Sequence, residues 1–144
     1  MTSIYVESSA LLRVVLEGDV RLGREIETFE RLVTCALTPV EALRALARAA
    51  RGRRVAPKAF RLCEERLRQF EASAASMVLD GAVLDRARRP FAAPVRTLDA
   101  IHLASIEIWR TEIGCADVAS TDDRVREGAA ALGCRLWPRI NRGL

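Results

Sequence analysis

Lysine is almost absent from this chain, although its net charge is positive. Lys58 is the single lysine among 23 basic residues, and the 144-residue chain has a net charge of +4. The positive charge gathers in two segments, which contain Arg51, Arg53, Arg54, Lys58 and Arg61, then Arg86, Arg88 and Arg89. The guanidinium fork matches phosphate geometry, but charge runs also commonly form ordinary solvated surface. Charge alone therefore favours a nucleic-acid partner only slightly.

Long hydrophobic runs are also missing. No segment reaches the roughly 18 consecutive apolar residues of a membrane span, and the N-terminus lacks the basic start of a signal peptide. We therefore expect a cytoplasmic protein without membrane contact. Half of the residues are hydrophobic, which is enough to build a buried core in a chain of this length. We expect one domain over residues 1–144.

Closely spaced cysteines, which would indicate a metal site or a redox motif, do not occur. The four cysteines are Cys35, Cys63, Cys115 and Cys134. Their spacing contains no CxxC pair. Without a secretion signal, the expected state is that of buried, reduced thiols.

Short strands alternate with helical segments along the whole chain. The expected strands cover residues 3–6, 34–37, 77–79, 117–120 and 134–137. The expected helical segments cover residues 8–16, 20–32, 38–50, 56–72, 81–89, 97–109 and 122–132. This alternation predicts an α/β fold, a three-layer α/β/α sandwich around a mostly parallel sheet of four to five short strands.

Four acidic residues follow strands or begin helices, at the edge where ligands bind in such sheets: Glu7, Glu41, Asp99 and Asp123. Each also has an ordinary structural interpretation. Glu41 would complete a capping box with Thr38, Asp99 would stabilise a helix N-terminus, and Asp123 would cap a helix. Glu7 could simply be solvated. Together, however, four converging carboxylates would repel one another unless a cation lay among them.

Hard oxygen ligands of this kind suit Mg²⁺ or Mn²⁺. Such ions activate water and stabilise the charge that develops on a phosphate during in-line displacement. The predicted chemistry is therefore metal-assisted hydrolysis of a phosphodiester. It depends on the four carboxylates lying close together, which a single sequence does not establish.

Four motifs in order resemble those of PIN domains. They are YVESSALLRVVLEGD from Tyr5, TPVEALRAL from Thr38, RTLDAIHLASIE from Arg96 and ADVASTDDRVREGAAALGCRLWP from Ala116. Each motif is weak alone, but their order and spacing cover almost the whole chain. The pattern is most similar to the VapC toxins of type II toxin–antitoxin pairs.

The resemblance implies a set of site residues. The acidic metal ligands, which would also be the catalytic residues, correspond to Glu7, Glu41, Asp99 and Asp123. Supporting residues around them correspond to Ser8 or Ser9, Thr121 and, ranked lower, Asp122. The implied cofactor is Mg²⁺ or Mn²⁺.

The resemblance also implies a function and partners. PIN toxins of this type are endoribonucleases that cut RNA, often structured RNA such as tRNA. A small VapB-like antitoxin would neutralise the protein by covering the acidic site, commonly through an arginine. Homodimerisation is usual in the family, and the apolar helices within residues 20–72 are the expected surface.

One motif departs from the family pattern, because Glu7 stands where an aspartate is usual. The additional methylene shifts the carboxylate by about 1.5 Å, and small misplacements of catalytic groups are expensive. The alternative function is therefore a catalytically weakened PIN-like module that binds RNA or protein. A receiver-like signalling domain is disfavoured, because the chain lacks an acidic pair after its first strand and a late lysine.

Two further polar residues are interpreted as structural. His102 is the chain's only histidine and lies one helical turn after Asp99. A catalytic base is conceivable there, but we expect His102 to pack and form hydrogen bonds. Asp117 falls at the start of a strand, and we expect it to stabilise the fold.

Overall fold

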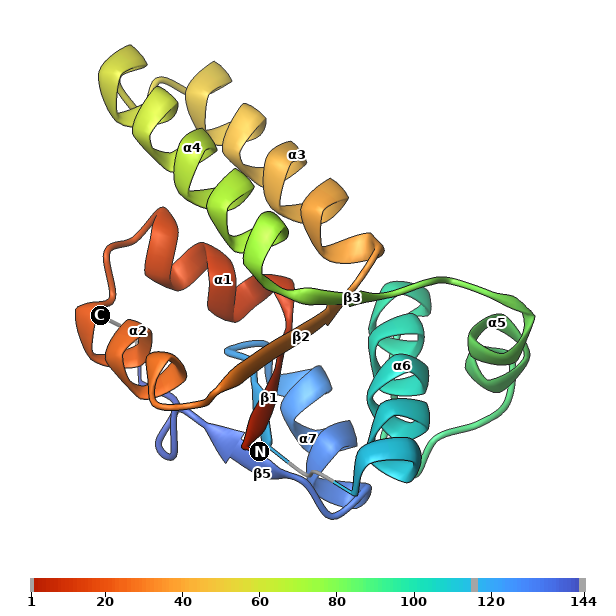
Figure 1. Cartoon of the computed structure of the whole chain (residues 1–144). Helices are drawn as coiled ribbons and strands as arrows, with labels where there is room; N and C mark the ends of the chain where they lie inside the picture. Colours follow the sequence, from red (N-terminus) through yellow and green to blue (C-terminus); the bar gives the residue numbers. More distant parts are fainter. Residues whose placement is uncertain (1, 115–116, 143–144) are drawn as a thin grey trace.

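A computed structural model describes residues 2–114 and 117–142 of the chain. In chain order its elements are β1 (Ser3–Val6), α1 (Ser8–Val15), α2 (Val20–Glu27), β2 (Arg31–Cys35), α3 (Leu37–Arg51), α4 (Pro57–Ser73), β3 (Ala75–Met77), α5 (Gly81–Ala87), α6 (Thr97–Ile113), β4 (Asp117–Ala119), α7 (Asp123–Ala131) and β5 (Arg135–Trp137). Figure 1 shows the twisted sheet between two groups of helices.

The sheet has the strand order β3-β2-β1-β4-β5, and every neighbouring pair is parallel. β1 lies in the middle, with Ile4 opposite Leu32 of β2 and Tyr5 opposite Val118 of β4. Because all strands are parallel, their carboxyl ends meet at one edge. The predicted α/β/α sandwich with its central parallel sheet is confirmed.

Each face of the sheet carries its own hydrophobic core, since successive side chains of a strand point to opposite faces. Alternation along β1 sends Ile4 and Val6 to one face and Tyr5 to the other. The first core includes Leu11, Leu22, Leu46 and Leu67 from the helices α1 to α4. The second includes Leu103, Ile106, Trp109 and Val125 from α6 and α7.

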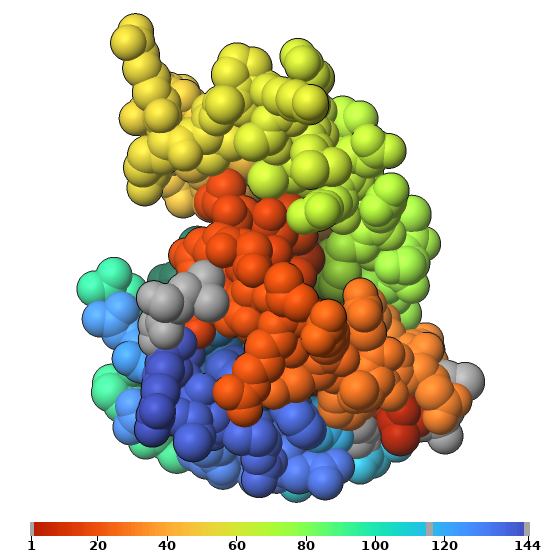
Figure 2. All heavy atoms as spheres, turned by 90° about the vertical axis from the view of Figure 1, so that its left-hand side faces the viewer, coloured from red at the N-terminus to blue at the C-terminus, as the bar shows by residue number. Residues whose placement is uncertain are grey.

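Helices α3 and α4 form an antiparallel hairpin that stands away from the sheet (Figure 1). Figure 2 shows this hairpin above α1 and α2, with the C-terminal segment below them. Its tip carries the basic segment predicted from the sequence, and Arg51, Arg53, Arg54, Lys58 and Arg61 are all exposed there.

Two predicted boundaries are wrong. The second helix ends at Glu27, and residues 31–33, expected at or beside its end, already belong to β2. Leu32 and Val33 are compatible with either a helical or an extended apolar pattern, so periodicity did not resolve this short segment. The third strand also begins earlier, at Ala75 in place of Met77.

The predicted buried thiols are found at Cys35, Cys63 and Cys134, whereas Cys115 lies outside the described residues. Within residues 2–114 and 117–142, no helix has both the length and the apolar character needed to cross a membrane.

Candidate metal centre at the carboxyl edge of the sheet

Glu7 follows the last residue of β1 and is held firmly in place. Its backbone N–H donates to the carbonyl of Ala119 at 2.9 Å, which ties it to the end of β4. Its side chain is only 6% exposed. The carboxylate accepts hydrogen bonds from Ser8 (3.0 Å), from Ser120 (2.8 Å) and from Ser9. Serine hydroxyls therefore surround both oxygens of this glutamate.

Glu41 reaches the same edge because the predicted capping box does not form. Helix α3 begins at Leu37, so Thr38 lies inside the helix and is buried, and its hydroxyl accepts a hydrogen bond from Thr34 at 2.7 Å. The Glu41 carboxylate accepts instead from the hydroxyl of Ser8 at 2.8 Å. Ser8 thus connects the two glutamates.

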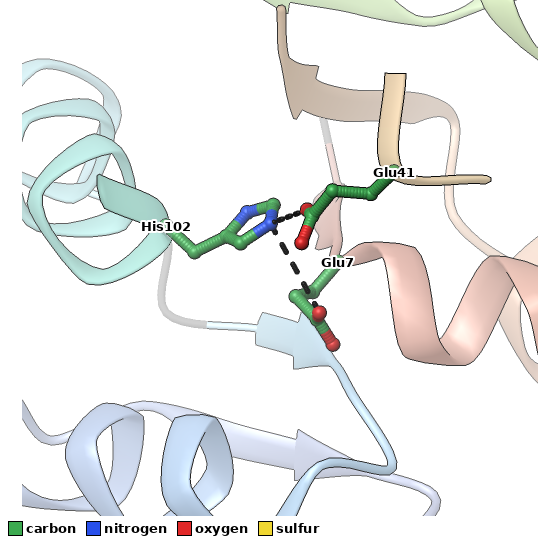
Figure 3. Close-up of side chains that lie close together, drawn as sticks. All are labelled: Glu7, Glu41 and His102. Atoms are coloured by element: carbon green, nitrogen blue, oxygen red, sulfur yellow. Dashed lines mark hydrogen bonds and ion pairs between the residues drawn. The ribbon is translucent and has the colours of Figure 1, made fainter. Parts of the chain in front are cut away.

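His102 projects from α6 toward both glutamates (Figure 3). Its Nε2 atom lies 2.5 Å from Oε1 of Glu41 and 4.0 Å from Oε1 of Glu7. Its Nδ1 atom lies 2.9 Å from the Tyr5 hydroxyl and 3.7 Å from the Cys35 sulfur. The prediction that His102 packs and forms hydrogen bonds is confirmed, but its partners are the candidate metal ligands themselves.

The charges in this cluster depend on one another. Burial alone would lower the pKa of His102, but hydrogen bonds with Cys35 and Glu41 and the charge of Glu7 outweigh it and raise that pKa to about 10. Burial raises the pKa of Glu41, but its hydrogen bond and charge interaction with His102 outweigh burial and lower that pKa. Without metal, these pKa shifts favour a protonated His102 beside an ionised Glu41.

The pKa of Cys35 is changed by the same histidine. Burial raises it, but the hydrogen bond and charge of His102 outweigh burial, and the pKa falls to about 7. The nearby Tyr5 hydroxyl has its pKa raised, chiefly by burial and then by Cys35. The buried network therefore continues from the glutamates to the second core.

The chemistry of these donors fits a divalent metal. One ligand atom each from Glu7, Glu41 and His102 lies within 4.8 Å of the others. Glu7 and His102 are almost completely buried, so water does not solvate their polar groups and these must be satisfied within the site. Two carboxylates and one imidazole are common ligands of divalent ions.

Asp99 and Asp123, the other two predicted ligands, do not belong to this close group. Asp99 lies in the first turn of α6, and its carboxylate accepts from the backbone N–H of Arg96 at 3.1 Å. Asp123 is exposed, and its carboxylate accepts from the side-chain amide of Asn141 at 3.1 Å. In the described residues, the tight cluster thus contains Glu7 and Glu41 but neither aspartate.

The predicted supporting residues have distinct roles. The Ser9 hydroxyl bonds Glu7 and accepts from the backbone N–H groups of Thr121 (2.9 Å) and Asp122 (3.1 Å). Asp122 is the N-cap of α7 and accepts from the N–H groups of Arg124 and Val125. Asp122 therefore has a structural role as a helix cap.

Sequence reasoning missed two polar residues near the site. Ser120 bonds Glu7, and its position directly after a strand was an available signal. Asn141 bonds Asp123 and the carbonyl of Thr121, and its side-chain oxygen accepts from Arg13 at 3.3 Å. No local pattern indicates Asn141, because these contacts join distant segments.

Asp117 lies at the opposite end of β4 from the site. Its carboxylate accepts from Arg135 and from the indole N–H of Trp137, both at 3.0 Å, which connects β4 with β5. The structural interpretation of this residue is confirmed.

Comparison with known proteins gives a consistent picture. Residues 4–131 match the model of the PIN domain family. The chain is 32% identical over 136 residues to Ribonuclease VapC46 from Mycobacterium tuberculosis, which covers 92% of this chain and 95% of that protein. The crystal structure of PAE2754 from Pyrobaculum aerophilum is similar with a TM-score of 0.56 at 20% identity, covering 92% of this chain and 90% of that one.

Proposed function

Because this chain belongs to the PIN domain family and is a VapC-type member of it, we propose that it is a divalent-metal-dependent endoribonuclease. It hydrolyses RNA phosphodiester bonds as the toxin of a toxin–antitoxin pair, and residues 1–144 act as one cytoplasmic domain. The observation that carries this proposal is the meeting of Glu7, Glu41 and His102 at the carboxyl edge of the sheet. This is the edge at which parallel α/β sheets bind ligands.

Glu7 and Glu41 are the residues best placed to hold Mg²⁺ or Mn²⁺. When bound, the metal supplies a nucleophilic water and neutralises charge on the phosphate. The serine hydroxyls fix the carboxylate of Glu7, so its orientation does not depend on metal binding. Asp99 and Asp123 complete the proposed acidic set from the first turns of α6 and α7.

Arginines beside the α6 N-terminus support an RNA substrate. A cavity of about 390 Å³ is lined by Arg88, Arg89 and Arg96 and by the ring of Phe91. It adjoins the helix turn that carries Asp99, so phosphates flanking the cut would meet these guanidinium groups. Structured RNA such as tRNA would also reach the basic tip of the α3–α4 hairpin.

Apolar surface on the same hairpin supports protein partners. The exposed residues Val40, Leu43 and Leu62 lie on α3 and α4. A groove of about 590 Å³ runs between α1, α2 and α4 and is lined by Val14, Ile26 and Phe70 among others. We propose that these surfaces serve homodimerisation and binding of a VapB-like antitoxin.

Cleavage of total bacterial RNA tests the proposed function. Wild type with Mg²⁺ or Mn²⁺ should cut discrete sites, while an EDTA control and Asp99→Asn should be silent. Silence of a folded wild type would overturn the nuclease proposal. It would favour the alternative, a PIN-like binding module weakened by Glu7.

A further inference from the structure

Helix α6 presents His102, not Asp99, to the two glutamates. The two residues are one helical turn apart, and the Asp99 carboxylate is bonded to the backbone of Arg96. The His102 Nε2 atom, in contrast, lies within 4.0 Å of an oxygen of each glutamate. Thus the side chain of α6 that reaches the centre of the site is an imidazole.

The ring of His102 is held in one orientation. Its Nδ1 atom bonds the hydroxyl of Tyr5, which is fully buried, and the two rings meet edge-to-face at 6.1 Å. A histidine that binds metal through one nitrogen generally bonds a fixed partner through the other. Since Tyr5 engages Nδ1, Nε2 is the ring nitrogen directed at Glu7 and Glu41.

We propose that His102 is a metal ligand together with Glu7 and Glu41, and that its imidazole makes the site prefer Mn²⁺ over Mg²⁺. Mg²⁺ takes oxygen ligands and retains water, whereas imidazole suits transition metals. This inference rests on the proposed function only in assuming that the two glutamates hold the metal. It adds a nitrogen ligand and a metal preference.

The competing explanation is that His102 serves only as a positive charge between the glutamates. In that case a metal would bind through carboxylates and water, and the imidazole would remain outside its coordination shell. The short distance from Nε2 to Oε1 of Glu41 shows that both atoms are directed at the same small region of the site. A metal in that region would therefore be within reach of the imidazole as well as of the carboxylates. The two explanations differ in whether a nitrogen is bonded to the metal.

Pulsed electron paramagnetic resonance of Mn²⁺ bound to the full chain distinguishes them. The chain contains one histidine, so a sample without an affinity tag has a single imidazole. We expect nitrogen modulation from one imidazole, altered when the histidine is labelled with ¹⁵N. Bound Mn²⁺ with oxygen ligands alone would overturn the inference, and so would a chain that binds no Mn²⁺.

Binding constants provide a second measurement. In His102→Gln the Kd for Mn²⁺ should rise about 10- to 100-fold, which is the loss of metal affinity typical when a metal site loses a supporting group. The Kd for Mg²⁺ should rise less than about 3-fold. Tyr5→Phe removes only the hydroxyl and should weaken Mn²⁺ by about 10-fold. Ser105→Ala is the matched control, since this buried serine of α6 bonds the carbonyl of Ile101. Equal weakening of both metals in His102→Gln would overturn the preference.

RNA cleavage measured in parallel separates this inference from the proposed function. Cleavage with an all-oxygen Mn²⁺ site would overturn the role of His102 and leave the nuclease intact. A nitrogen-bound Mn²⁺ in a protein that cuts no RNA would support the role of His102 and overturn the nuclease.

Discussion

The four predicted acidic residues divide into two pairs with different surroundings. Glu7 and Glu41 share the hydroxyl of Ser8 and face the buried imidazole of His102. The Asp99 carboxylate accepts from the nearby backbone N–H of Arg96, and the exposed Asp123 carboxylate accepts from the side-chain amide of Asn141. The glutamates are therefore enclosed by more side-chain contacts than the aspartates, and we expect the first pair to be the more rigid. This difference teaches that similar positions at strand ends and helix starts do not give similar surroundings, since only the glutamates join the buried cluster in the described residues.

Moving the carboxylates by one methylene should produce the largest contrast. Glu7→Asp withdraws its carboxylate from Ser9 and Ser120, so we expect RNA cleavage to fall about 10- to 100-fold. The opposite change, Asp123→Glu, should lower the rate only a few-fold, because Asp123 is exposed. Initial cleavage rates at saturating Mn²⁺ measure both effects. A faster Glu7→Asp enzyme would contradict this and support the weakened-module alternative.

Replacing a carboxylate by an amide should destabilise the protein more in the first pair than in the second. Glu41→Gln leaves the His102 imidazolium without its nearest counter-charge, and we expect the free energy of unfolding to fall by about 2 kcal/mol. This is less than the cost of breaking a fully buried ion pair, because Glu41 is partly exposed. Asp99→Asn should cost less than about 1 kcal/mol, since it affects one exposed helix cap. Urea unfolding in EDTA gives both values. Equal losses would show that the first pair is not the more rigid one.

The pH dependence of stability should report on the first pair. His102 has a pKa raised from 6.5 to about 10, so its contribution is complete below pH 6.5 and is lost as pH rises toward 10. Glu41 has a lowered pKa, so its contribution is present above pH 4.5 and is lost as pH falls. Metal-free protein should therefore be most stable between about pH 4.5 and 6.5. In thermal unfolding with EDTA, the stability of His102→Gln should decrease less than that of wild type as pH rises toward 10.

The smallest effect on cleavage and stability should come from replacing Asn141, which bonds Asp123 of the second pair. Asn141→Ala removes the amide that joins Asp123 and Thr121 to Arg13. We expect cleavage to slow about 2- to 5-fold and unfolding to change by about 1 kcal/mol or less, as for a partly exposed hydrogen bond. Arg139→Ala, an exposed change in the same segment, is the control. A loss as large as that in Glu7→Asp would erase the distinction between the pairs.

Several site features were predictable because they depend on local pattern. The short apolar run of β1 followed by Glu7, and the acidic start of α6, placed carboxylates at the right edge of a parallel sheet. The start of α3 was not predictable in this way. Thr38 and Glu41 have capping-box spacing, but the buried hydroxyl of Thr34 donates to Thr38, and the N-cap is Ala36, two residues earlier.

The sequence by itself determined the fold class, the order of strands and helices and the presence of acidic residues at strand ends, because hydrophobic periodicity and helix signals act over short distances. Only the tertiary structure decided which of these residues meet. His102 and Glu41 are 61 residues apart in the chain, yet their side chains are in contact. That contact results from packing α3 and α6 around the same sheet edge, which no local pattern encodes.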